Sequence, residues 1–90
     1  MKTTELASNF GWSVVGNGGG FECFAKSIGG LCAEITDGES PNYPEITYDE
    51  CVLTIRDDRT GQSIISVNFN DLPSAIQWFN PAKITDMREA

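Results

Sequence analysis

Two segments in which apolar and polar residues alternate, joined by a short polar turn, constrain the fold of this chain more than any other feature. The segments are Tyr48–Arg56 and Gln62–Phe69, and the turn between them is Asp57–Gly61. Alternation with a period of two places apolar side chains on one face of a strand, so both segments are expected to be half-buried strands. The residues expected on the core face are Cys51, Leu53, Ile55, Ile65, Val67 and Phe69. Gly61 suits the left-handed position that closes a bulged hairpin, so the sequence predicts an antiparallel hairpin here.

Three further strands are expected ahead of this hairpin. Trp12–Val15 is apolar and partly β-branched, and Phe21–Ile28 is joined to Leu31–Thr36 by the two-residue turn Gly29-Gly30. A glycine-rich stretch, residues 16–20, separates the first two strands. Because it leads into a strand and not into a helix, it is expected to be a loop without a phosphate-binding role.

One helix is expected after the last strand, over Asp71–Phe79. Asn70 or Asp71 can cap it, and Pro73 falls in the first turn, where its missing N–H costs little. Its apolar stripe consists of Leu72, Ala75, Ile76 and Phe79. A helix this short does not persist alone in water, so it must lie on the sheet.

These elements predict one α+β domain spanning residues 1–90. An antiparallel four- to five-stranded meander sheet is expected to carry one C-terminal helix packed on one face. Residues 1–10 show no period and are expected to fray, with at most one helical turn around Leu6. Residues 82–90 are polar and are also expected to fray.

The charge balance limits what such a domain can bind. Thirteen Asp and Glu residues stand against six Lys and Arg, which gives a formal net charge of −7, and the chain has no histidine. A surface of this charge repels nucleic-acid phosphates and anionic membranes and attracts basic partners. The missing histidine removes the commonest general base and the commonest metal ligand. Direct binding of nucleic acid or of a membrane is therefore not expected.

The sequence patterns that could carry catalysis or bind a metal are weak. The runs of carboxylates lack the spacing of a calcium-binding loop, which needs a Glu at its twelfth position. Two pairs remain as candidates for catalysis, Cys23 with Lys26 and Tyr48 with Glu50. Neither pair has a histidine base, so we expect no enzymatic activity, no cofactor and no metal ion.

The three cysteines, Cys23, Cys32 and Cys51, all lie in apolar stretches. Without a C-x-x-C pair or a histidine they do not form the pattern of a zinc site. Buried, reduced thiols are expected, while a disulfide between two of them or a reactive thiol remains open. No run approaches the roughly 18 apolar residues of a membrane span, and the start has no apolar signal core. An intracellular, reducing compartment is therefore expected.

The loop 37–47 and the hairpin turn hold the candidate binding residues. A loop of this length is expected to be either poorly ordered or functional. Within it, Tyr43 has no apolar neighbour in the loop to support it, so the ring is expected to anchor an interface, whereas Trp78 is expected to pack over the sheet edge. The candidate partner-binding residues are Asp37, Glu39, Tyr43, Asp49, Glu50, Asp57 and Asp58.

Parts of the chain resemble known types of small protein. Gly18–Phe24 together with Glu34–Pro41 resembles small accessory proteins encoded by phages and prophages, and Asn70–Phe79 resembles the helix-on-sheet ending of some anti-CRISPR proteins. The resemblance implies a stand-alone accessory protein or host-defence inhibitor that acts by binding in the cytoplasm of the host cell.

Charge, size and resemblance together lead to one functional expectation and one alternative. The expectation is a non-enzymatic inhibitor that presents an acidic surface to a host nucleic-acid-handling complex, a CRISPR or other defence complex, and blocks it. The alternative is a small structural or self-associating phage accessory protein. It would form a homodimer through an exposed sheet edge such as Trp12–Val15.

Overall fold

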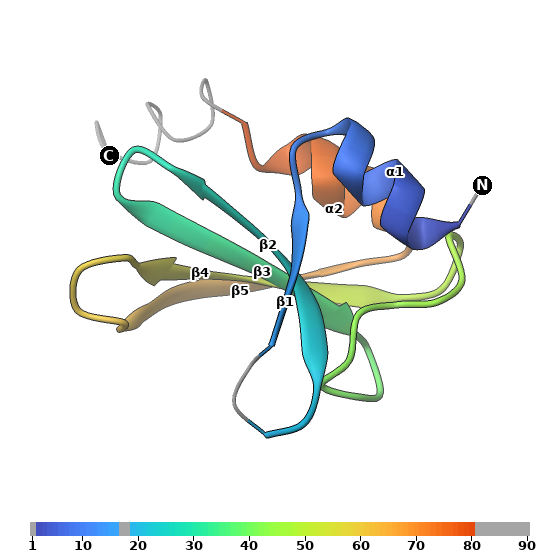
Figure 1. Ribbon diagram of the computed structural model, residues 1–90, viewed down its shortest axis with the longest axis horizontal. Coiled ribbons are helices and arrows are strands. Elements are labelled where there is room, and N and C mark those ends of the chain that lie inside the picture. Colours follow the sequence, from blue (N-terminus) through green and yellow to red (C-terminus); the bar gives the residue numbers. More distant parts are fainter. Residues whose placement is uncertain (1, 17–18, 81–90) are drawn as a thin grey trace.

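A computed structural model describes residues 2–16 and 19–80, which form a five-stranded antiparallel sheet and two helices (Figure 1). In chain order the elements are α1 (Thr3–Asn9), β1 (Ser13–Gly16), β2 (Glu22–Ile28), β3 (Leu31–Asp37), β4 (Cys51–Asp57), β5 (Ser63–Phe69) and α2 (Leu72–Trp78). The strand order is β1-β2-β3-β4-β5, so each strand pairs with its neighbour in sequence. The predicted α+β class and meander topology are confirmed.

The alternation of β4 decides which face of the sheet is buried. Leu53 lies opposite Ile35 of β3 and Val67 of β5, and Ile55 lies opposite Ala33 and Ile65. These pairs share the face that the helices cover, because directly opposed residues of antiparallel strands point the same way. The predicted core face is therefore confirmed for β4, whose Cys51, Leu53 and Ile55 are buried, whereas in β5 Val67 and Phe69 are half-buried and Ile65 is 41% exposed. A register shift between Ile55 and Arg56, with φ of 74° at Gly61, also confirms the bulged hairpin.

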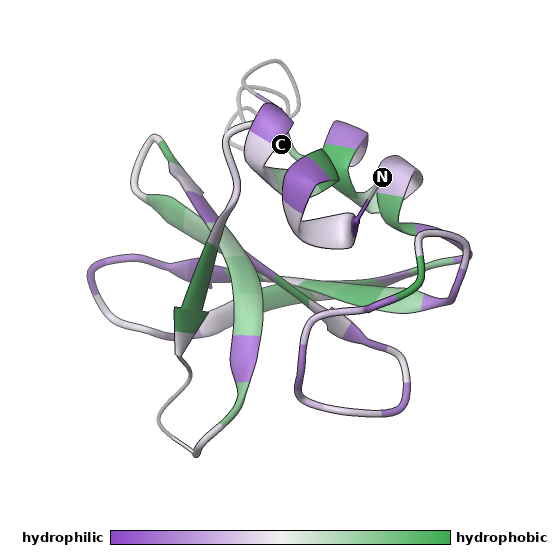
Figure 2. Cartoon of the chain, turned by 45° about the vertical axis from the view of Figure 1, so that its right-hand side comes forward, coloured by the Kyte–Doolittle hydropathy of each residue, from purple (hydrophilic) through white to green (hydrophobic). Residues whose placement is uncertain are grey.

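Both helices pack on this one face, and no described residue forms a helix on the opposite face of the sheet (Figure 2). Asp71 caps α2 by accepting a hydrogen bond from the backbone N–H of Ser74 at 2.8 Å. The buried residues of the helix and its C-terminal end are Leu72, Ala75, Ile76 and Phe79. Trp78 makes an edge contact with Phe69 of the edge strand β5, as expected, with ring centroids 5.9 Å apart.

The N-terminal segment differs from the sequence prediction. Residues 1–10 were expected to fray or to form one turn, whereas Thr3–Asn9 forms the helix α1. Ala7 is buried in the core, and its carbonyl accepts from the N–H of Trp12 at 2.9 Å. Lys26 Nζ donates to the carbonyl of Phe10 at 2.8 Å and so satisfies the C-terminal end of the helix. Because the helix is held by residues outside it, residues 1–10 need no apolar periodicity of their own.

Several predicted boundaries also shift. Trp12 precedes β1 and is buried against Phe79, with ring centroids 6.0 Å apart. Tyr48–Glu50 lies outside β4, which begins at Cys51, because the loop turns back at these residues. The prediction for residues 82–90 falls outside the described residues.

Candidate functional site

The long connection between β3 and β4 is held in place by backbone hydrogen bonds to two other segments and by one that joins its own two ends. The N–H of Tyr43 donates to the carbonyl of Glu22 in β2 at 2.7 Å, and the N–H of Leu72 in α2 donates to the carbonyl of Thr47 at 2.9 Å. At its base, the N–H of Gly38 donates to the carbonyl of Glu50 at 3.1 Å. The loop is therefore a defined surface of the domain.

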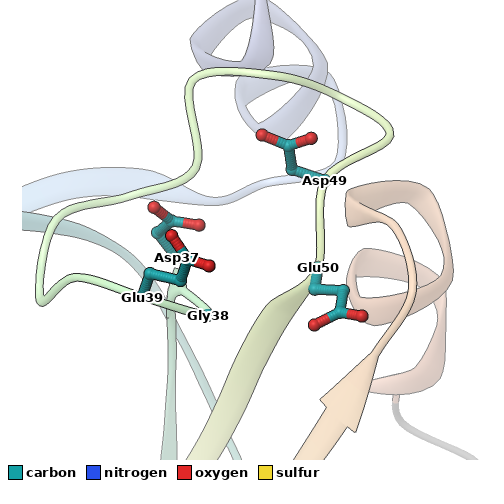
Figure 3. Close-up of a pocket in the computed structure, with 5 residues that line it drawn as sticks. All are labelled: Asp37, Gly38, Glu39, Asp49 and Glu50. Carbon is teal, nitrogen blue, oxygen red and sulfur yellow. The ribbon is translucent and has the colours of Figure 1, made fainter.

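The pairing of β3 with β4 brings carboxylates from both ends of this loop together. Asp37 lies opposite Cys51 in the antiparallel register, so the residues that follow Asp37 meet those that precede Cys51. An open hollow of about 340 Å³ results, lined by Asp37, Gly38, Glu39, Asp49 and Glu50 (Figure 3). In Figure 3 the carboxylate of Glu50 points away from that of Asp49. The structure thus brings together four of the seven predicted binding residues.

A second hollow of about 320 Å³ continues this surface under the loop. It shares Asp37 and Asp49 with the first hollow, and its remaining lining residues are Ser40, Asn42, Tyr43, Glu45 and Ile46. We call the carboxylates that line the two hollows the acidic loop surface. Its members are Asp37, Glu39, Glu45, Asp49 and Glu50.

Asp57 and Asp58 do not belong to this surface. They lie at the other end of β4, and a seven-residue strand separates its ends by about 20 Å at a rise of about 3.3 Å per residue. The carboxylate of Asp57 accepts from the N–H groups of Arg59 and Thr60, at 2.8 and 3.3 Å. These two hydrogen bonds lower the pKa of Asp57 and shape the hairpin turn. The seven predicted binding residues therefore do not all lie on one surface.

Tyr43 has a packing role that the loop sequence does not show. Its ring stacks on Phe24 of β2, with centroids 4.8 Å apart and an interplanar angle of 19°. The side chain is half-buried at the border of the core. The ring therefore has a supporting neighbour, which comes from β2 and not from the loop.

Two apolar side chains of the loop that the sequence does not predict as binding residues are exposed. Tyr48 is 81% exposed and Ile46 is 58% exposed. The N–H of Asp49 donates to the carbonyl of Ile46 at 3.2 Å, which closes a turn and projects these side chains outward. The sequence placed Tyr48 at the start of a strand. The adjacent Asp49-Glu50 pair, unfavourable in a strand interior, was the signal that could have marked the turn.

Within the described residues, no ion pair neutralises the acidic loop surface. The ion pair that the described residues do form lies elsewhere, on the sheet face opposite the helices. It joins Nε of Arg56 to Oε1 of Glu34, which are 2.6 Å apart. Lys26 is directed to the carbonyl of Phe10. The five carboxylates of the surface therefore present their charge to solvent.

Two of the three cysteines, Cys23 and Cys51, are placed as poor nucleophiles. Burial, reinforced by a hydrogen bond to Glu34, raises the pKa of Cys23 to about 12. Burial, with the nearby charges of Asp71 and Asp37, raises the pKa of Cys51 to about 11. All three thiols are free, and Cys32 is half-buried.

Neither of the two candidate catalytic pairs is assembled. Cys23 and Lys26 occupy opposite faces of β2, since they are three residues apart in a strand. Tyr48 projects into solvent from the turn, whereas Glu50 lines the acidic hollow. These placements give no activated nucleophile next to a base.

Across residues 2–16 and 19–80, no three Cys, Asp or Glu side chains are grouped in a way that could hold a metal ion. In the same part of the chain, neither helix has the length and apolar character needed to cross a bilayer.

Comparisons with protein-family models, with curated proteins and with solved structures give no match to this chain.

Proposed function

We propose that this chain is a non-enzymatic inhibitor that binds a basic protein surface through its acidic loop surface. The partner is a nucleic-acid-handling complex in the cytoplasm of a host cell, and binding blocks the site that normally holds nucleic acid. The observation that carries the proposal is the convergence of five carboxylates around two adjoining hollows of one loop, none of them in an ion pair with another described residue. The resemblance to phage-encoded inhibitors supports the choice of partner class.

The electrostatics favour fast and salt-sensitive association. A cluster of like charges on a molecule of net charge −7 steers a basic partner toward the loop, and salt weakens this attraction over a Debye length of about 8 Å at physiological ionic strength. A groove that binds phosphates has the complementary charge. The acidic loop surface therefore matches a nucleic-acid site in sign.

Tyr48 and Ile46 supply the apolar contact area that the charged carboxylates do not. Exposed carboxylates contribute mainly to the association rate, whereas a tight complex also needs desolvated anchors, among which tyrosine is enriched. Both side chains stand beside the carboxylates and are exposed in the free protein. Tyr48 takes the anchoring role that the sequence assigned to Tyr43.

The state of the thiols supports binding over catalysis. The thiolate is the reactive form of cysteine, and a raised pKa keeps Cys23 and Cys51 protonated at neutral pH.

The test is capture of the partner from nuclease-treated host lysate at low and high salt, using two variants with matched charge. Asp49→Asn with Glu50→Gln removes two charges from the acidic loop surface. Asp58→Asn with Glu5→Gln removes two charges elsewhere. We expect the wild type and the second variant to capture a basic complex at low salt, and the first variant to lose it.

The captured complex is then challenged with the nucleic acid it handles. If binding occludes the nucleic-acid site, excess nucleic acid releases the complex from the wild-type protein. A ternary complex, or equal capture by both double variants, would overturn the proposal.

A further inference from the structure

The first half of the loop between β3 and β4 has no buried side chain. Residues 38–42 are exposed or half-buried, whereas Pro44, two residues later, is fully buried, and Tyr43 stacks on Phe24. Glu39, one of the carboxylates of the acidic loop surface, lies in this first half. Its position therefore depends more on the hydrogen bonds of the loop than on packing.

Asn42 bridges the ends of two strands at the point where they diverge. The pair of β2 and β3 residues nearest the loop is Phe24 with Ile35, so the two strands no longer pair with each other at Glu22 and Asp37. The side-chain Oδ1 of Asn42 accepts a hydrogen bond from the N–H of Glu22 at 3.3 Å. The backbone carbonyl of Asn42 accepts from the N–H of Asp37 at 2.7 Å. One residue of the loop thus contacts both strand ends.

Two further hydrogen bonds fix the backbone around Asn42. Its N–H donates to the hydroxyl of Ser40 at 3.0 Å, which closes a local turn. The N–H of the next residue, Tyr43, donates to the carbonyl of Glu22 at 2.7 Å, beside the contact that Asn42 makes with the same residue. The loop therefore returns to the sheet in a defined orientation, with Asn42 and Asp37 both lining the second hollow.

We propose that Asn42 is a positioning residue of the acidic loop surface. It holds Asp37 and Glu39, at the β3 end of the loop, in place relative to Asp49 and Glu50 at the β4 end. The inference rests on the proposed function, because it concerns how an uncharged residue sets the shape of the surface that binds the partner. Asn42→Ala leaves the net charge of −7 unchanged, so its effect on binding reports geometry and not charge.

This restraint matters because the carboxylates of the surface repel one another. Like charges held near each other favour any movement that separates them, and the hydrogen bonds of Asn42 oppose that movement. Only the bond to Oδ1 depends on the side chain, since the other two use backbone atoms of Asn42. An aspartate offers the same acceptor and an alanine does not.

The first test measures the loop without a partner, by hydrogen exchange of single amides followed by NMR. In Asn42→Ala the amide of Glu22 should exchange about fivefold faster, the factor expected for loss of one neutral hydrogen bond. Exchange at Asp37 should also become faster, although its acceptor is a backbone atom that the variant keeps, because the whole segment moves. Asn42→Asp should restore wild-type exchange. Gln62→Ala removes an exposed carboxamide from the distant hairpin and should leave both amides unchanged.

The second test uses a hexalysine peptide as a basic probe, titrated at low salt and followed by NMR. Asn42→Ala should bind the peptide about threefold more weakly than the wild type or Gln62→Ala, because a loosened loop must be ordered on binding. All three proteins have the same charge. Asn42→Asp keeps the acceptor and adds a charge, so it should bind at least as tightly as the wild type. Circular dichroism checks that each variant is folded.

The outcomes separate this inference from the proposed function. Unchanged exchange at both strand ends in Asn42→Ala, or a hexalysine affinity equal to that of the wild type, would overturn the positioning role. The two double variants of matched charge described above are titrated with the same peptide. Equal affinity for these two would instead count against the acidic loop surface as the binding site, and the exchange rates would still decide whether Asn42 fixes the loop.

Discussion

Arg56 and Glu34 form an ion pair across neighbouring strands, with Nε of Arg56 in β4 donating to Oε1 of Glu34 in β3 at 2.6 Å. The second oxygen of Glu34 accepts from the thiol of Cys23 in β2 at 3.3 Å. Arg56 also donates to the hydroxyl of Ser63 in β5 at 3.4 Å. One diagonal line of polar contacts therefore joins four strands on the face opposite α1 and α2.

Replacing Glu34 tests this line of contacts. Glu34→Gln removes the ion pair, and because both side chains are partly solvated we expect a loss of about 1 kcal/mol in the free energy of unfolding by urea. The pKa of Cys23 should fall, since a neutral amide no longer opposes the thiolate, but burial keeps it above 9.0. Glu22→Gln, the same change at an exposed position of β2, is the control. A thiol pKa that is the same in both variants would contradict this account.

How far the sequence predicts this fold depends on whether the deciding contacts are local. The β4–β5 hairpin follows from alternation and from Gly61, which are features of one continuous segment. The helix α1 was missed because its stability comes from Ala7 in the core and from Lys26, contributed by β2. No pattern within the first ten residues carries that information.

The candidate site also has one part that the sequence predicts and another part that only long-range contacts determine. When β3 pairs with β4 so that Asp37 lies opposite Cys51, Asp37 and Glu50 come close together. This part of the site could therefore be predicted from the sequence. The same register places Asp57 at the far end of β4, which a list of acidic residues does not reveal. The stacking of Tyr43 on Phe24 joins two segments distant in sequence, so only the folded chain shows it.

Alkaline pH should destabilise the protein through its buried thiols. The pKa values of Cys23 and Cys51 in the folded state, about 12 and about 11, lie above the ordinary value of 9.0. At pH values between the ordinary thiol pKa and the raised pKa of the folded state, the unfolded chain holds fewer protons than the folded one. The free energy of unfolding therefore falls as pH rises through this range. The slope approaches about 1.4 kcal/mol per pH unit for each thiol.

Urea denaturation at a series of pH values above 9.0 measures this slope. Cys23→Ala and Cys51→Ala should each show a shallower decline than the wild type, although both start from a lower stability because a buried side chain is lost. The difference in slope between each variant and the wild type isolates the contribution of the thiol that the variant lacks. Identical slopes in all three proteins would show that these thiols ionise alike in both states.

The cap of α2 should make stability depend on acid pH. Hydrogen bonds from Ser74 lower the pKa of Asp71 below its ordinary value of 3.8. The contribution of this carboxylate is therefore complete above pH 3.8 and is lost as pH falls through the lower, folded-state pKa. Asp71→Asn keeps a good cap without an ionisable group, so its stability should match the wild type near neutral pH and decline less in acid.

Asp71→Ala separates the cap from the charge. This variant loses both, so thermal melts should show lower stability at every pH, together with a weaker acid dependence than the wild type. Should Asp71→Asn decline in acid as steeply as the wild type, the acid transition would belong to other carboxylates, with Asp57 the next to test because its pKa is also lowered.

The two tyrosines of the loop should separate stability from binding. Tyr43 is half-buried against Phe24, so Tyr43→Ala should cost about 2 kcal/mol, somewhat less than truncation of a fully buried aromatic residue. Tyr43→Phe keeps the stack and should change the free energy of unfolding little. Tyr48 is 81% exposed, so Tyr48→Ala should alter stability by less than about 0.5 kcal/mol.

The affinity for the partner should depend on the tyrosines in the reverse order, more on Tyr48 than on Tyr43. Once the partner has been captured, Tyr48→Ala should weaken its affinity by more than about 1 kcal/mol, as loss of an interface anchor does, while Tyr43→Phe leaves it unchanged. Isothermal calorimetry against the purified partner gives the affinities, and urea denaturation gives the stabilities. An affinity that tracks stability across these variants would mean that the loop only supports the fold. An affinity lost in Tyr48→Ala alone would assign the contact to the exposed ring, beside the five carboxylates of the acidic loop surface.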